Sequence, residues 1–140
     1  VQVSYSCIHN YVESAETSYT GAPIIRKGAI SAKKGEKVII PVNMQAGIIL
    51  GTGKGNDDWN QSAPHGAGRL YKRSDVRQNF TVSQFKKAMA GIYSSCISEG
   101  TLDEAPFAYR NLEDILQVIG DTVDVDQVIH PIYNYKAGNE

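Results

Sequence analysis

The stretch Asn60–Arg73 constrains the fold of this chain most, because one proline and two glycines interrupt regular secondary structure around a histidine. Pro64 fixes its own φ angle and favours an extended residue before it, while Gly66 and Gly68 let backbone amides approach a ligand closely. A helix that begins near Gly66 would direct its unpaired N–H groups and its positive dipole end towards His65. The pattern therefore predicts a turn that can hold an anion such as phosphate beside this imidazole.

Basic residues follow this turn at a helical spacing. Arg69, Arg73 and Arg77 recur every four residues, and Lys72 lies between them. Residues four positions apart share one side of a helix, so the spacing predicts a basic helical face. A solvated helix surface has the same pattern, and glycine-rich turns are common. These residues alone therefore leave open whether the turn binds a ligand.

Length and composition indicate one ordinary globular domain. The chain has 140 residues and contains neither a signal-peptide pattern nor an apolar run long enough to span a membrane. Cys7 and Cys96 are its two cysteines, which gives no disulfide framework and favours a reducing, cytoplasmic location. The formal net charge of -1 excludes a generally basic nucleic-acid coat, so any contact with RNA must be local.

Hydrophobic periodicity predicts strands at both ends of the chain. Residues 24–32 and 37–40 are predicted to be the two strands of a hairpin with a glycine turn between them. Residues 47–52 are apolar enough for a short buried strand. Residues 123–135 alternate loosely around Pro131, which predicts an edge strand or two short strands.

Capping residues predict helices in the second half of the chain. Thr81 and Gln84 match a capping box, so a helix should begin immediately after Thr81. Asn111 should cap another helix over residues 112–119. Together these elements predict an α+β fold, in which β-hairpins and a mixed sheet pack against two or three helices, with His65 at the junction.

Six segments resemble one protein family. S-A-P-H-G-A-G-R at residues 62–69 resembles the nucleotidylated-histidine motif of the RtcB family of RNA-splicing ligases. Further segments resemble family blocks in the family's order: I-H-N-Y-V at 8–12, R-K-G-A at 26–29, I-P-V-N-M at 40–44, D-E-A-P-F-A-Y at 103–109 and Y-N-Y-K-A-G at 133–138. These blocks cover nearly the whole chain, but they resemble only the C-terminal part of a family member.

The resemblance implies that residues 1–140 are the C-terminal part of an RtcB-like catalytic domain. The chain begins at Val1 rather than Met, directly on an alternating apolar segment, and we therefore expect it to be a piece of a longer protein or a processed product. The missing N-terminal part of the same protein would carry most of the metal ligands. We expect the chain alone to be an incomplete enzyme.

The resemblance further implies an enzyme that joins an RNA 3′-phosphate, or a 2′,3′-cyclic phosphate after opening, to a 5′-hydroxyl, in tRNA splicing or RNA repair. Such an enzyme uses GTP and Mn²⁺, and His65 is the nucleophile that carries GMP. His9 resembles a manganese ligand, although a lone histidine of this kind is more often simply hydrogen-bonded. Lys27, Arg69 and Arg73 resemble residues that meet GTP phosphates or RNA ends, and solvent-facing charge is the alternative for Lys27.

A nucleotide site is implied in the same way. Its residues are Asn10 against the phosphate, the loop residues Pro41, Asn43 and Met44, the turn residues His65, Gly66, Ala67 and Gly68, Tyr109 stacked on guanine, and Lys136 hydrogen-bonded to the base. Tyr109 has the flat face that stacking requires, though a packed aromatic is the commoner role. Val42, Asn43 and Ile48 depart from the glycine, serine and small hydroxyl residue usual in the family. The chain resembles a second branch in this respect, which leaves the guanosine preference open.

Two other classes of function remain open. One is a nucleotide- or phosphate-binding module that has kept the motif without ligation, and such a module would bind GTP without forming a covalent adduct. The other is a non-catalytic interaction or folding fragment in which the histidine turn is structural. Replacing His65 would then leave ligand and RNA binding unchanged.

Overall fold

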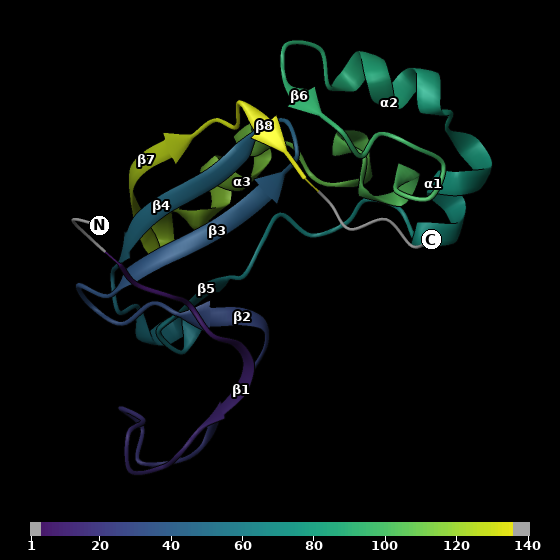
Figure 1. The fold of residues 1–140 in the computed structure, drawn as a ribbon. Coiled ribbons are helices and arrows are strands. Elements are labelled where there is room, and N and C mark those ends of the chain that lie inside the picture. Colours follow the sequence, from purple (N-terminus) through teal and green to yellow (C-terminus); the bar gives the residue numbers. More distant parts are fainter. Residues whose placement is uncertain (1–3, 136–140) are drawn as a thin grey trace.

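The computed structural model describes residues 4–135 of the chain (Figure 1). The strands in this range are β1 (His9–Glu13), β2 (Ile24–Ser31), β3 (Lys37–Asn43), β4 (Gly47–Gly53), β5 (Ser62–Pro64), β6 (Tyr93–Ser94), β7 (Val123–Ile129) and β8 (Tyr133–Asn134). The α-helices are α1 (Arg73–Asn79), α2 (Val82–Ala88) and α3 (Leu112–Val118), joined by the 3-10 turns η1 (Asp57–Trp59), η2 (Leu102–Glu104), η3 (Pro106–Ala108) and η4 (Ile119–Asp121). No helix within these residues has the length and apolar character needed to cross a membrane.

The strands form two larger sheets and one small one. β2 lies between β1 and β5 in an antiparallel sheet, and β4 lies between β3 and β7 in a second antiparallel sheet. β6 and β8 form a parallel pair. Figure 1 shows β1 and β2 extending away from the second sheet, with α1 and α2 on the other side of that sheet's end. This mixed arrangement of sheets and helices confirms the predicted α+β class.

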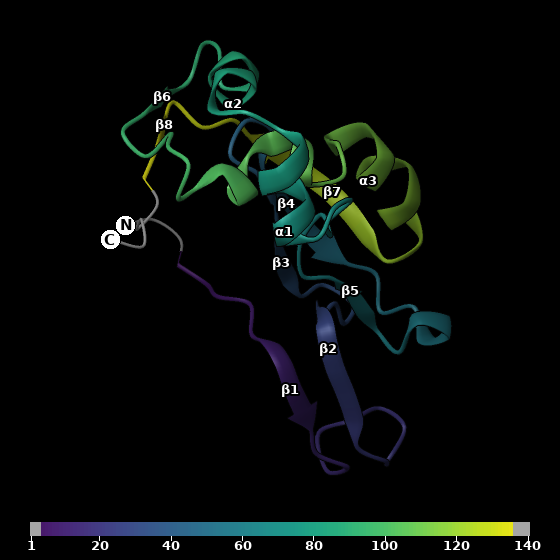
Figure 2. The same ribbon diagram turned by 90° about the vertical axis from the view of Figure 1, so that its right-hand side faces the viewer.

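The first hydrophobic core lies between the second sheet and α3. Val38, Ile40 and Val42 occupy alternate positions of β3 and are buried, because successive side chains of a strand point to opposite faces. They pack in one cluster with Ile115 and Ile119 of α3 and η4. Figure 2 shows α3 lying against one face of this sheet.

A second core holds the helical part of the molecule together. Val76 of α1 and Phe85 of α2 are fully buried, and they cluster with Leu102 and with Met44 from the turn after β3. Tyr109 packs against both hydrophobic cores. The region around Tyr109 therefore joins the sheet part of the molecule to its helical part.

Both predicted capped helices are confirmed. Thr81 accepts a hydrogen bond from the Gln84 amide, and the Gln84 side chain accepts one from the Thr81 amide, which completes the capping box of α2. The Asn111 side chain accepts from the Asp114 amide at the start of α3. The predicted strand over residues 47–52 corresponds to β4, and residues 123–135 form the two strands β7 and β8.

We expect Thr81→Ala to lower the free energy of unfolding by about 1 kcal/mol, because alanine cannot accept the hydrogen bond that caps α2. Urea denaturation measures this change. Ser83→Ala is a matched control, since Ser83 is an exposed hydroxyl residue in the same helix and lies outside the cap. Equal stabilities of the two variants would show that the capping box contributes nothing.

The predicted hairpin over residues 24–40 is wrong. Both segments are strands, but β2 pairs with β1 and β5, whereas β3 pairs with β4. Ala32, just after β2, donates its amide to the Gln61 carbonyl instead of pairing towards β3. The turn at Gly35, with a φ of +81°, carries the chain from one sheet to the other.

The helix expected to begin near Gly66 is also wrong. Gly68 has a φ of +72°, outside the helical region, and Arg69 forms an antiparallel bridge with Tyr109. Leu70 then donates its amide to the Ala108 carbonyl at 2.9 Å. These long-range contacts hold the segment extended, so α1 begins only at Arg73 and Arg69 lies outside it.

Candidate functional site

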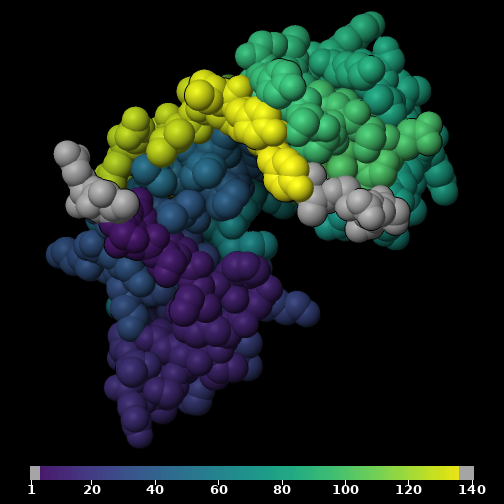
Figure 3. Space-filling model, in the orientation of Figure 1, coloured from purple at the N-terminus to yellow at the C-terminus, as the bar shows by residue number. Residues whose placement is uncertain are grey.

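A cavity of about 950 Å³ opens where the two sheets and the helical part of the molecule meet. Ten of the residues singled out in the sequence line it: His9, Pro41, Asn43, Met44, His65, Gly66, Ala67, Gly68, Arg69 and Tyr109. They come from β1, β3, the turn after β5 and the bridge to Tyr109. Figure 3 shows a hollow on this face, beneath the segment that leads to β8. Tyr133 and Asn134 also line it, so the fold gathers residues from five of the six sequence blocks at one cavity.

His65 and His9 lie side by side in this cavity. Their rings are stacked, with centroids 5.0 Å apart and planes at 27°. Both histidines are exposed, and no side chain among the described residues hydrogen-bonds the His65 ring. An exposed imidazole with accessible ring nitrogens can act as a nucleophile or as a metal ligand.

Gly28 lies against the His65 ring, and Asn10 is hydrogen-bonded to Gly28. Gly28 has a φ of +69°, and a Cβ added there would lie 3.6 Å from His65 Cε1 and Nδ1, so the ring lies directly over this glycine. The Gly28 amide donates to Asn10 Oδ1 at 2.7 Å, and the Gly28 carbonyl accepts from the His65 amide at 3.3 Å. Asn10 is itself in a left-handed conformation, with a φ of 59°, at a break in the β1–β2 register. The side-chain amide group of Asn10 donates no hydrogen bond within the described residues.

The turn after His65 is anchored on β3. Ala67 is buried and donates its amide to the Pro41 carbonyl at 3.1 Å, and a Cβ at Gly66 would lie only 3.2 Å from the same oxygen. Within residues 4–135, the amides of Gly66 and Gly68 donate no hydrogen bond. Glycine is needed at Gly66 for this close approach, and the turn leaves two backbone donors available next to His65.

Three arginines converge on one buried carboxylate: Arg73 and Arg77 share one side of α1 as predicted, whereas Arg69 reaches it from the extended segment before the helix. Asp103, with a side chain 3% exposed, accepts from Arg73 at 2.5 Å and from Arg77 at 3.0 Å, and Arg69 lies 3.7 Å from it. Burial alone would raise the pKa of Asp103, but the hydrogen bonds and charges of Arg77 and Arg73 outweigh it and lower that pKa. Glu104 adds ion pairs to Arg69 and Arg73 at 3.0 and 3.1 Å. The cluster therefore contains three cations and two anions.

Tyr109 is tied into this cluster. Its hydroxyl donates to Glu104 Oε2 at 2.8 Å and accepts from Arg69 Nη2 at 3.1 Å, while the Arg69 guanidinium lies 4.7 Å from the ring centroid. Burial, followed by the hydrogen bond to Glu104, raises the pKa of Tyr109 to about 12, so the phenol stays protonated. Arg69 thus lies over the Tyr109 ring and holds it at the cavity wall.

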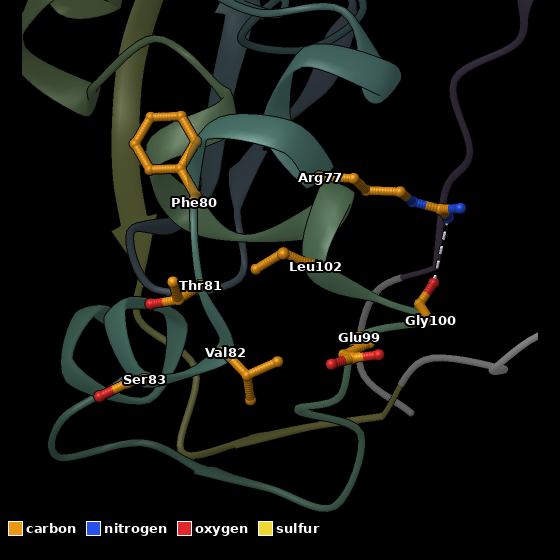
Figure 4. A pocket seen from close by; sticks show the side chains of 8 residues that line it. All are labelled: Arg77, Phe80, Thr81, Val82, Ser83, Glu99, Gly100 and Leu102. Atoms are coloured by element: carbon orange, nitrogen blue, oxygen red, sulfur yellow. Dashed lines mark hydrogen bonds between the residues drawn. The ribbon is translucent and has the colours of Figure 1, made fainter.

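Arg77 reaches a second cavity on the helical part of the molecule. This cavity has a volume of about 770 Å³ and lies beside α2, with Phe80 and Leu102 among its apolar residues. Figure 4 shows Arg77 at its edge, with a dashed line for its hydrogen bond to the Gly100 carbonyl. This hydrogen bond is 3.4 Å long. Because Arg77 also binds Asp103, the arginine cluster connects the edges of the two cavities.

Three of the described residues singled out in the sequence do not line the first cavity. Lys27 is exposed on β2, Asn10 lies beneath His65, and Arg73 faces Asp103 and Glu104. Lys136 lies outside the described residues. Asn43 does line the cavity, but its Oδ1 accepts the amides of Gln45 and Ala46 at 3.0 and 2.8 Å and closes the β3–β4 turn.

The described residues do not form a complete metal site. No group of three or more His, Cys, Asp or Glu side chains suited to a metal ion occurs within residues 4–135. His9 and the adjacent His65 are the nitrogen ligands that the cavity offers there. A metal bound in this cavity would need additional ligands from outside these residues.

Two features of the structure were not predicted from the sequence: the carboxylates that bind the three arginines, and a buried ion pair in the first sheet. The solvent-facing charge expected as the alternative for Lys27 was our expectation for the adjacent Arg26 too, but Arg26 is 2% exposed and donates to Glu13 at 2.6 Å. The positions of Ile24, Arg26 and Ile30 would have indicated that Arg26 is buried, because residues at even spacing lie on the same face of β2. Asp103 and Glu104 lie in the segment 103–109 that resembles a family block, but the sequence did not indicate that they bind the arginines.

Comparison with known proteins places the chain in a family. The family model described as tRNA-splicing ligase RtcB matches residues 1–137. The RNA-splicing ligase RtcB of Escherichia coli (strain K12) is 33% identical over 132 residues, which cover 94% of this chain and 32% of that protein. The tRNA-splicing ligase RtcB of Aeropyrum pernix is 31% identical over 140 residues, which cover 84% of this chain and 29% of that protein. The chain thus spans about a third of the length of these relatives, and it belongs to the RtcB family.

Proposed function

We propose that this chain forms the nucleotide-handling part of an RNA ligase that joins RNA 3′-phosphate or 2′,3′-cyclic phosphate ends to 5′-hydroxyl ends. The ligase uses GTP and Mn²⁺ and passes through a histidine–GMP intermediate at His65, in tRNA splicing or RNA repair in the cytoplasm. One observation carries this proposal: the exposed His65 ring is stacked on His9 in a cavity next to two available backbone donors.

The chemistry begins with a ring nitrogen of His65. It forms a P–N bond to the α-phosphorus of GTP while the bond from that phosphorus to pyrophosphate breaks, and pyrophosphate leaves with the electron pair. An oxygen of the RNA 3′-phosphate then attacks the same phosphorus, and the P–N bond breaks as the electron pair returns to His65. The 5′-hydroxyl finally attacks the activated RNA phosphorus and loses its proton, and GMP leaves.

Several donors can stabilise the charged phosphate oxygens during these steps. The amides of Gly66 and Gly68 and the side-chain amide of Asn10 all have hydrogen-bonding capacity left, and they lie in or beneath the turn that holds His65. Fixed donors next to a reacting phosphorus lower the barrier because they need not reorganise as charge develops.

The volume of the cavity and the residues that line it support GTP as its ligand. A volume of about 950 Å³ lies within the range of small-molecule sites. Tyr109 supplies a flat ring and Arg69 a cation, although both are already hydrogen-bonded to each other and to Glu104. Pro41, Asn43 and Met44 line the same wall, and Lys136 completes the proposed base contacts.

Mn²⁺, when bound, neutralises negative charge on the phosphate oxygens. His9 is the ligand that this chain would contribute, because its exposed ring lies beside His65 in the cavity. The other ligands would come from the missing N-terminal part of the same protein. Lys27, Arg69 and Arg73 would then position GTP phosphates or RNA ends, which requires RNA to compete with Asp103 and Glu104 for two of these cations.

Intact-mass spectrometry after incubation with GTP and Mn²⁺ tests the proposal. We expect an increase equal to one GMP, removed by acid because a P–N bond is acid-labile, in the full-length protein. His65→Ala should abolish the adduct, whereas His130→Ala, at an exposed position outside the cavity, should leave it unchanged. An adduct that persists in His65→Ala, or none in the wild-type protein, would exclude His65 as the nucleophile.

A diverged nucleotide- or phosphate-binding module without ligase activity is the second candidate. It is favoured by the ion pairs of Arg69 and Arg73 with Asp103 and Glu104, because these pairs occupy two cations that ligation would need for phosphates. GTP binding by calorimetry that depends on the cavity residues, without any covalent adduct in the full-length protein, would support this candidate over the ligase.

A further inference from the structure

Tyr93 of β6 and Tyr133 of β8 form an exposed pair of stacked aromatic rings. They face each other in the parallel β6–β8 pair, with ring centroids 5.4 Å apart and planes at 20°. Their exposed fractions are 69% and 49%, and the neighbouring Ile132 and Tyr135 are 89% and 73% exposed. Clustered apolar groups of this size on a protein surface usually mark a binding site. We call Tyr93 and Tyr133 the tyrosine pair.

Hydrogen bonds fix the orientation of the tyrosine pair. The Tyr133 hydroxyl and Ser95 Oγ share a hydrogen bond of 3.0 Å, and the Tyr93 amide donates to the Ile132 carbonyl. Asn134, next to Tyr133, donates its side-chain amide to the Met44 carbonyl at 2.6 Å and so ties β8 to the wall of the cavity. The Tyr133 ring is therefore held by a hydrogen bond and the Tyr93 ring by stacking on it before any ligand arrives, which lowers the entropy lost on binding.

The tyrosine pair is continuous with the cavity that contains His65. Tyr133 and Asn134 line that cavity, and Tyr93 lies beyond its lining, stacked on the outer side of Tyr133. Figure 3 shows the segment that contains β8 passing over the hollow and reaching the helical part of the molecule. A polymer with one end at His65 has to leave the cavity past some part of its rim, and the tyrosine pair is one part of that rim.

Charge favours a nucleic acid over an acidic or apolar protein segment at this rim. Residues 69–110, which include Tyr93, contain seven Lys and Arg against four Asp and Glu, whereas the rest of the chain contains seven against eleven. The segment that contributes Tyr93 thus has a surplus of three positive charges, and the rest of the chain, which contributes Tyr133, has a surplus of four negative ones. A polyanion is attracted to the segment that contributes Tyr93.

We propose that the tyrosine pair stacks an unpaired base of the RNA strand whose end enters the cavity at His65. This inference rests on the proposed function and names a contact for the strand outside the nucleotide site. Stacking on tyrosine tolerates any base, because every base has a flat π face. The pair therefore contributes affinity for single-stranded ends without selecting a sequence.

Fluorescence anisotropy with a labelled, unpaired RNA oligonucleotide that has hydroxyl groups at both ends tests the inference. This RNA cannot react, so binding is measured without GTP or ligation, in the full-length protein at one fixed salt concentration. We expect Tyr93→Ala to weaken binding about 5- to 150-fold, the range for losing one stacked base. Tyr93→Phe should retain the affinity, and Tyr93→Leu, which keeps apolar bulk without a flat ring, should lose most of it.

Trp59→Ala is the matched control, because Trp59 is a 58% exposed aromatic residue in η1, outside the cavity. RNA affinity equal to that of wild type in Tyr93→Ala, or an equal loss in Tyr93→Ala and Trp59→Ala, would overturn the inference, and so would full affinity in Tyr93→Leu. These results are independent of the GMP adduct. An adduct at His65 with no effect of Tyr93→Ala rejects only the stacking contact, and a stacking effect without an adduct rejects only the nucleophile.

Discussion

Replacing Asp103 with alanine is expected to lower the free energy of unfolding by about 3 kcal/mol. The Asp103 side chain is 3% exposed and is the common acceptor of Arg73 and Arg77, with Arg69 at 3.7 Å. Without it, three guanidiniums remain close together, with Glu104 as the other carboxylate that pairs with Arg69 and Arg73. Arg73 and Arg77 are 67% and 51% exposed, so water replaces part of what they lose, which places the effect at the lower end of the range for buried ion pairs.

Urea denaturation of Asp103→Ala and of Asp124→Ala provides the comparison. Asp124 also forms an ion pair, with Lys54 at 3.3 Å, but its side chain is 69% exposed. We expect its removal to change stability by less than about 0.5 kcal/mol. If the two variants were equally stable, the three arginines would not depend on Asp103, and the cluster would be an ordinary surface network.

The charge of Asp103 also predicts a dependence on pH. Its pKa in the folded protein is lower than in the unfolded chain, because the hydrogen bonds and charges of Arg77 and Arg73 outweigh the effect of burial. The stabilisation is therefore complete above the unfolded pKa of about 4 and is lost as the pH falls through the lower folded pKa. Asp103→Asn should be less stable than wild type at neutral pH, and this difference should shrink in acid.

Local signals predicted those elements whose ends are set by neighbouring residues. The capping residues Thr81 and Asn111 fix the starts of α2 and α3 through hydrogen bonds that span three positions. β4 follows from a short apolar run. Each of these patterns needs only residues close in the sequence, so the sequence is sufficient to identify it.

Partner choice over long distances could not be predicted in the same way. The segments 24–32 and 37–40 have the composition of paired strands, but β2 is central in the first sheet because β1 and β5 occupy its two edges. A basic spacing of four residues correctly placed Arg73 and Arg77 on one side of α1, whereas Arg69 is held extended by Tyr109 and meets them at Asp103 and, with Arg73, at Glu104. The three evenly spaced arginines do come together, but they do so at the shared carboxylate of Asp103 and not along one helix.

In the candidate site, too, local features could be predicted from the sequence and long-range contacts could not. A turn at His65 was predicted from proline and glycine, but the helix expected near Gly66 does not form there, and the contact of Gly66 with the Pro41 carbonyl was not predicted. The 5.0 Å stacking of His65 on His9 joins residues 56 positions apart, which no local pattern specifies. Here the family resemblance, rather than periodicity, brought both histidines into one hypothesis, and the fold brings them into one cavity.

Arg26→Met is expected to lower the free energy of unfolding by about 3–5 kcal/mol, because it leaves the Glu13 carboxylate buried without its main partner. The side chains of Arg26 and Glu13 are 1% and 5% exposed, and Arg26 Nη1 lies 2.6 Å from Glu13 Oε2. Methionine fills most of the space but donates no hydrogen bond. Lys33, which also pairs with Glu13, remains as a partial replacement.

The double variant Glu13→Gln with Arg26→Met separates the loss of the pair from the loss of packing. Glutamine carries no charge, so the double variant should be more stable than Arg26→Met alone by at least about 1 kcal/mol. Chemical denaturation of the two single variants and the double variant completes the cycle. Independent, additive effects would mean that Glu13 does not depend on Arg26.

Arg26 also connects the sheet that positions the two histidines. Its guanidinium donates to Ser62 Oγ at 3.0 Å and to the Asn60 carbonyl at 3.2 Å, just before β5, and the Glu13 that it binds ends β1. β1 begins at His9, and His65 follows β5, so one buried cation ties together the strands that bear both rings. If His65 takes up GMP as proposed, we expect Arg26→Met to slow this uptake under conditions where the variant is still folded, whereas Arg26→Lys, which keeps the charge, should slow it less. Uptake at the wild-type rate in folded Arg26→Met would show that the ring positions do not depend on this arginine.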